Sequence, residues 1–155
     1  LHILIHSKSE IEPTGIPSQS HKGKAAVFLL DSGMTSETAP LVSIFLDNLE
    51  APAFRKMMKH EFIAISDRCI EHFLSGNISD LFSDVKKLSS VVLEHFSPMI
   101  PKRFRAVWKK GIDTNAYYLK LCGSGGGGYI LGFTQDLPKA KSILADHQLE
   151  VVYTF

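Results

Sequence analysis

Short apolar runs near the two ends of the chain predict β-strands. Each run either alternates apolar and polar side chains or is continuously apolar over a few residues, and both patterns are typical of strands. The predicted strands are residues 1–7, 24–33, 117–122, 129–134 and 150–155. Between the first two lies a polar segment, residues 8–23, whose two prolines and two glycines predict a long loop of a mobile or functional kind.

The middle of the chain repeats apolar side chains at helical spacing. In the first predicted helix, apolar residues recur from Leu41 to Leu49, Ser36 and Thr38 are candidate N-caps, and Pro40 suits the first turn. Further helices are predicted from residue 52 to the turn at 75–77, across 81–96, from 104 to a stop at Gly111, and over 137–148.

The order of these elements defines a fold class. Two strands are followed by several helices, and then by two strands, a helix and a last strand. This order predicts an α+β fold in which helices cover one face of an antiparallel sheet, as in a ferredoxin-like sandwich. Residues 117–122 and 129–134 are expected to be neighbouring strands joined by the glycines between them.

Composition and charge limit the kind of protein and the partners that the sequence can indicate. The chain has 155 residues, 45% of them hydrophobic and 21% charged, which fits one globular domain or one piece of a larger enzyme. The net charge of +1 gives no argument for nucleic acid or for an acidic membrane surface. The longest apolar runs are too short to span a membrane, and Cys69 and Cys122 do not form a disulfide framework. We therefore expect a cytoplasmic protein.

A glycine-rich stretch carries the strongest chemical signal. Five of the six residues 123–128 are glycine, and successive glycine N–H groups can turn toward one phosphate. A dinucleotide loop requires a helix directly afterwards, whereas a strand is predicted here, and a triphosphate loop requires a Lys after Gly128. The other protein-kinase motifs are not in the sequence. The motif is thus a strand, a glycine loop and a strand, preceded by Lys120; a plain flexible turn is the simpler alternative.

The segment KLCGSGGGGYILGF, residues 120–133, resembles the third motif of the GHMP kinases, a family that includes galactokinase, homoserine kinase and mevalonate kinase. A second segment, VFLLDSGMTSETAPLV, residues 27–42, is similar to the family's strand-to-helix segment at the start of its carboxy-terminal half. Thr38 falls on the family's Thr, whereas Ser36 stands where many mevalonate kinases carry Arg. The two segments together look most like the mevalonate kinase members.

The resemblance implies a two-domain kinase that transfers a phosphoryl group from ATP to a mevalonate-like alcohol. Its nucleotide-phosphate loop and its catalytic Asp would belong to an amino-terminal half, because neither motif occurs in this chain. Residues 24–155 would form the carboxy-terminal domain, and residues 1–23 the junction between the halves. That other half would be the main holder of ATP and Mg²⁺, and a homodimer is compatible with this organisation.

The resemblance also implies site residues, with no catalytic residue and no metal ligand in this chain. The residues lining the ATP side of the cleft would be Gly123, Ser124, Gly125, Gly126, Gly127 and Gly128. Thr38 and Lys120 would lie near the alcohol. Two histidine patterns, His2 with His6 and His60-Glu61, lack the further ligands that zinc requires. The alternative is a non-catalytic α+β module that binds an anion or a small molecule at the glycine loop.

Overall fold

The computed structural model describes residues 23–35 and 37–155. The predicted strand 1–7, nearly all of the loop 8–23 and the candidate cap Ser36 lie outside the described residues. The elements are β1 (Ala26–Asp31), α1 (Thr38–Leu49), α2 (Pro52–Met57), η1 (Met58–Ile63), α3 (Ala64–Leu74), α4 (Ile78–His95), η2 (Ser97–Met99), α5 (Lys102–Thr114), β2 (Tyr118–Leu121), β3 (Tyr129–Thr134), α6 (Leu137–Ile143) and β4 (Leu149–Thr154).

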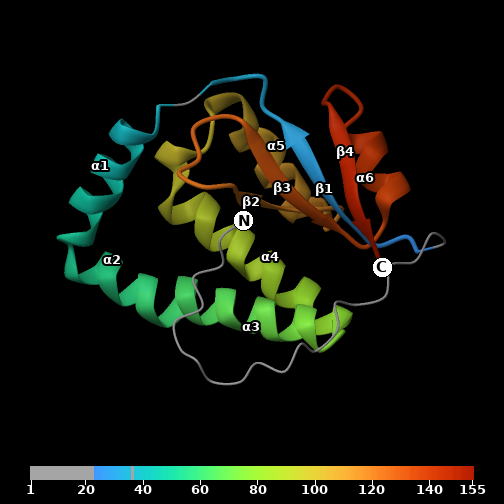
Figure 1. Cartoon of the computed structure of the whole chain (residues 1–155), viewed down its shortest axis with the longest axis horizontal. Helices are drawn as coiled ribbons and strands as arrows, with labels where there is room; N and C mark the ends of the chain where they lie inside the picture. The colour runs from blue at the N-terminus through green and yellow to red at the C-terminus, as the bar shows by residue number, and fades with distance from the viewer. Residues whose placement is uncertain (1–22, 36) are drawn as a thin grey trace.

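The four described strands form one sheet in the order β2-β3-β1-β4, and each neighbouring pair is antiparallel. A helical stretch connects β1 to β2, and α6 connects β3 to β4 (Figure 1). This is the split β-α-β arrangement of ferredoxin-like folds. The predicted α+β class and antiparallel sheet are confirmed, as is the pairing of the two strands that flank the glycines.

One face of the sheet is covered by helices, and it is most completely buried at β1. Alternate residues of β1 point to this face, where Phe28 and Leu30 are completely buried. They pack in one core with Trp108 of α5 and Leu144 of α6. Burying each such large apolar side chain contributes about 1.5–3 kcal/mol. This core therefore fixes α5 and α6 on the sheet, as the predicted sandwich requires.

Helix α4 packs along the edge of the sheet at β2, and α3 packs against α4. A second, smaller core joins Leu81 and Phe82 of α4 to Tyr118 of β2. The Ser89 hydroxyl of α4 accepts a hydrogen bond from the backbone N–H of Leu119 at 3.1 Å, in a buried position. An edge strand otherwise exposes unpaired backbone groups. Helix α4 thus packs against β2 and satisfies part of its free edge.

Two helices differ from their predicted ends, and a third differs in its internal geometry. Helix α5 continues through Gly111 to Thr114 and ends at Asn115, which has φ 51°. Gly111 stands in the helix because a Cβ there would clash with the ring of Tyr117. The helix predicted from residue 52 contains a π-helical segment, η1, and the last helix ends at Ile143 rather than at 148. In the part of the chain that the structure describes, no helix has the length and apolar character needed to cross a bilayer.

Candidate functional site

The glycine loop connects β2 to β3, and its backbone conformation explains why several of its residues are glycine. Four of them adopt positive φ angles: Gly123 at 59°, Gly125 at 76°, Gly126 at 78° and Gly128 at 66°. Glycine adopts this left-handed conformation without the steric penalty of a Cβ. The loop therefore has a defined course that other residues would strain, which argues against the interpretation as a plain flexible turn.

Two other segments of the chain hold the loop in place. The Gly126 N–H donates to the Met99 carbonyl at 2.6 Å, and the Gly128 N–H donates to the Met34 carbonyl at 2.7 Å. The Gly128 carbonyl in turn accepts from the Ser32 N–H at 2.8 Å. The loop is thereby fixed between the end of β1 and the short helix η2.

These bonds limit how many amides can meet a ligand. A third amide, that of Gly125, donates to the Cys122 carbonyl at 3.3 Å. Within residues 23–35 and 37–155, no hydrogen bond is found for the amides of Gly123, Ser124 and Gly127. The loop is therefore not a cradle of five convergent donors. Its capacity for an anion rests on these three amides.

The loop also lies against the start of α1. The Ser124 hydroxyl donates to the Thr38 hydroxyl at 3.4 Å, across 86 sequence positions. Thr38 is the first residue of α1, and Glu37 at the N-cap makes no side-chain capping bond. The first N–H groups of a helix lack partners within the helix and favour negative charge. The two segments that resemble the GHMP kinases thus meet in space, through an exposed Thr38 and a half-buried Ser124.

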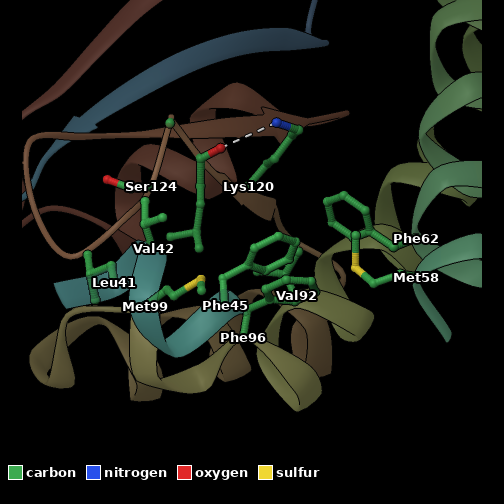
Figure 2. A pocket seen from close by; sticks show the side chains of 12 residues that line it. Leu41, Val42, Phe45, Met58, Phe62, Val92, Phe96, Met99, Lys120 and Ser124 are labelled. Atoms are coloured by element: carbon green, nitrogen blue, oxygen red, sulfur yellow. Dashed lines mark hydrogen bonds between the residues drawn. The ribbon is translucent and has the colours of Figure 1, made fainter. Parts of the chain in front are cut away.

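A pocket of about 290 Å³ opens on one side of the loop; we call it the apolar pocket. Figure 2 shows Lys120 and Ser124 on the side of the pocket opposite Phe96 and Met99. Its other walls come from α1, through Leu41, Val42 and Phe45, and from η1, through Met58 and Phe62. The sequence analysis gave Met58 and Phe62 no role in binding. Their apolar periodicity is that of a core helix, and the π-helical turn was not predicted.

Lys120 lies half-buried at this pocket. Its ammonium group donates to the Leu121 carbonyl at 3.3 Å. Among the described residues, no salt bridge involves Lys120. An ammonium group carries three N–H donors, so it can donate a hydrogen bond to a further partner. The structure therefore brings Thr38, Lys120 and the glycine loop into one region.

A second hollow, of about 300 Å³, lies on the other side of the loop at Gly126. It is bounded by Glu37 and Pro40 at the start of α1 and by Lys102 and Arg105 at the start of α5. Arg105 also donates from Nε to the Ile100 carbonyl at 3.4 Å. The glycine loop thus borders both an apolar pocket and a hollow that carries both signs of charge.

One buried charge was not predicted from the sequence. Asp84 of α4 accepts hydrogen bonds from Arg68 at 2.8 and 3.2 Å and from Lys87 at 2.9 Å. The bond from Arg68 is the main cause that lowers the pKa of Asp84 to about 2. The cluster joins α3 to α4 and has no contact with the glycine loop among these bonds. The sequence pattern that could have indicated this buried charge is an aspartate within the apolar helical stripe that includes Leu81 and Leu88.

The other candidate chemistry is not assembled into a site. His2 and His6 lie outside the described residues, and His60 and Glu61 are exposed on η1. No group of three or more His, Cys, Asp or Glu side chains that could hold a metal ion was found in the described part of the chain. Cys122 is exposed at the start of the glycine loop.

No protein-family model matches this sequence, and a search of curated protein sequences returns no match.

Proposed function

We propose that this chain is the carboxy-terminal half of a GHMP-type kinase, which transfers a phosphoryl group from ATP to an alcohol similar to mevalonate. The observation that carries this proposal is the contact between Ser124 of the glycine loop and Thr38 at the start of α1. These are the two segments on which the resemblance rests, and they meet on a sheet of ferredoxin-like strand order.

In this proposal the chain supplies one wall of a cleft between two halves. Phosphoryl transfer depends mainly on positioning and on neutralising charge. The free amides of Gly123, Ser124 and Gly127, with the start of α1, support negatively charged oxygens near the reacting end of the alcohol. Lys120 adds a positive charge on the alcohol side.

The other half supplies the catalytic Asp and holds ATP and Mg²⁺, so none of the described residues is assigned a catalytic role. Bound Mg²⁺ bridges the phosphates of ATP and neutralises charge in such enzymes. We place the enzyme in the cytoplasm, with a homodimer as one assembly it could form.

The test compares the isolated chain with the two halves together. Purified chain is mixed with Mg-ATP and mevalonate, and ADP release is followed with and without the amino-terminal half of the same protein. We expect turnover only with both halves, because alignment of two reactants supplies a large share of the rate. Turnover by the isolated chain would contradict the proposal, and so would an inactive pair of halves that form a complex.

A pair of exposed substitutions tests the assigned region. Thr38→Val removes the hydroxyl that accepts from Ser124 and keeps the side-chain shape. Ser43→Ala, on the same helix and also exposed, is the matched control. We expect Thr38→Val to lower kcat/KM of the joined halves at least tenfold, with the control unchanged. Equal activity of the two variants would remove Thr38 from the site.

A second candidate function is supported by the apolar pocket. A non-catalytic module that binds a small molecule requires a formed pocket, and the apolar pocket lies beside the glycine loop. The two candidates differ in one measurement, because a binding module retains its full ligand affinity without an amino-terminal half.

A further inference from the structure

The apolar pocket has a composition that defines the kind of ligand it fits. Of the residues that line it, the polar side chains are Lys120 and Ser124, and both lie on the same side. The remaining side chains are aliphatic, aromatic or methionine, apart from Gly123. Small-molecule pockets are typically apolar with a few polar groups that fix orientation, and about 290 Å³ is near the lower end of their size range.

The floor of the pocket is preformed by packed aromatic rings. The Phe96 ring stacks on Phe45 with centroids 6.4 Å apart and contacts Phe62 at 5.1 Å. Phe96 is buried by this packing, with 6% exposure. The pocket therefore does not depend on a ligand to create its deepest wall.

The wall formed by α1 is incompletely buried. No residue of this helix is buried, and Val42 at the mouth of the pocket is 42% exposed. Leu41 and Phe45 pack against the core but are only partly buried. A ligand with an apolar body would remove this surface from water, and such burial is favourable in proportion to its area.

The polar side of the pocket selects the charge of the ligand. Lys120 is half-buried, its single hydrogen bond in the described structure goes to a carbonyl, and no salt bridge there involves it. The hydroxyl of the half-buried Ser124 lies on the same side and can add a hydrogen bond. An anionic group placed here would gain a charge-assisted hydrogen bond.

We propose that the apolar pocket binds a free amphipathic anion, an aliphatic chain that ends in a carboxylate or a phosphate monoester. The chain lies among Phe45, Met58, Phe62 and Phe96, and the anionic head pairs with Lys120. The pocket shares Lys120, Gly123 and Ser124 with the proposed kinase site and is the pocket of the second candidate function. The inference does not depend on the kinase activity, since this binding requires neither ATP nor a second half of the enzyme.

Isothermal titration calorimetry of the full 155-residue chain with straight-chain carboxylates tests the proposal. Affinity is expected to rise about fourfold for each methylene from hexanoate to decanoate, as expected for methylenes that enter an apolar site, and then to level off. Decyl phosphate should bind with an affinity similar to that of decanoate, and decanol at least tenfold more weakly. Equal binding of decanol, or no saturable binding of any of these ligands, would overturn the proposal.

Two pairs of variants locate the site. Lys120→Met keeps the apolar stem and removes the charge; Lys139→Met is its control, since Lys139 likewise donates to a backbone carbonyl, that of Thr114 at 3.2 Å. Val42→Trp fills the mouth of the pocket, and Ser43→Trp places the same ring beside it on α1. We expect at least a tenfold loss of decanoate affinity for the first member of each pair and less than a twofold change for its control.

Two further titrations distinguish the proposed ligand from a nucleotide and from a membrane surface. Mg-ATP should leave decanoate binding unchanged, and displacement of decanoate by ATP would assign the pocket to the nucleotide instead. Phosphatidylserine vesicles should not bind the chain. Binding to vesicles without binding of free decanoate would overturn the proposal in favour of a membrane surface. Circular dichroism of every variant confirms that a loss of affinity is not a loss of fold.

Discussion

Gly125 of the glycine loop offers a sharp test of the structure, because its surroundings differ from those of the neighbouring Gly123. Both residues have positive φ, 76° and 59°. A Cβ on Gly125 would lie 2.6 Å from the Met99 carbonyl oxygen, whereas a Cβ on Gly123 would have no neighbour within 4 Å. The substitution Gly125→Ala therefore adds a steric conflict to the conformational cost that Gly123→Ala also has.

The size of each effect follows from these contacts. A non-glycine residue at positive φ costs about 1–2 kcal/mol, and this is the whole expected cost of Gly123→Ala. In Gly125→Ala the Met99 carbonyl must also move, although it accepts the Gly126 N–H at 2.6 Å. Loss of that hydrogen bond adds about 1–3 kcal/mol. The free energy of unfolding should therefore fall by about 2–5 kcal/mol in Gly125→Ala.

Urea unfolding measures the difference, with the fluorescence of the fully buried Trp108 as the probe. Gly125→Ala should be less stable than Gly123→Ala by at least about 1 kcal/mol, because the lost hydrogen bond adds to a shared conformational cost. Equal midpoints and slopes for the two variants would refute the packing of the loop against η2. A matched loss of ligand affinity in both variants, without a difference in stability, would show that these glycines act on a ligand rather than on the fold.

Other regions of the structure give further predictions. Ser89→Ala leaves a buried backbone N–H of β2 without its acceptor; urea unfolding should show a loss of about 1–3 kcal/mol, and Ser90→Ala, which loses a bond within α4, should show much less. The pKa of Asp84 is lowered to about 2, so its contribution is present above the ordinary value of 3.8 and is lost as pH falls toward 2. Asp84→Asn should lower the free energy of unfolding by about 2 kcal/mol at pH 6, and the difference from the unsubstituted protein should be smaller at pH 2.5. A difference that does not change with pH would contradict the ion-pair account. Burial raises the pKa of the Cys69 thiol to about 11, whereas Cys122 is exposed; at pH 8 a thiol reagent should therefore modify Cys122 first, and Cys122→Ser should abolish the rapid phase.

Local patterns in the sequence predicted the sheet well, because the pattern that indicates each strand spans only a few consecutive residues. The apolar run at β1 and the two runs around the glycines became neighbouring strands with nearly the predicted bounds. The pairing of the latter two follows from a short connection between antiparallel strands. The strand order β2-β3-β1-β4 required the further knowledge of how such elements are usually connected.

The features that sequence reasoning missed depend on contacts between distant segments. The sequence pattern predicts a helix stop at Gly111, but this glycine lies inside α5, where the Tyr117 ring leaves no room for a Cβ. The amides of Gly126 and Gly128 read as free donors, but carbonyls from η2 and from the end of β1 occupy them. The apolar pocket combines α1, η1, α4 and the glycine loop, so no single stretch of sequence indicates it.

The position of β1 in the sheet has a consequence for how the protein is made. Both neighbours of β1, the strands β3 and β4, come from the last part of the chain. At a synthesis rate of about 5–20 residues per second, the ribosome needs roughly 5–20 s to add residues 32–128 before β3 begins. The helices from α1 to α5 can form during this time, while the apolar β1 has no described strand to pair with. The newborn chain therefore exposes this apolar strand until β3 and β4 have been made, and this interval is when the strand is most open to aggregation or to capture by a chaperone.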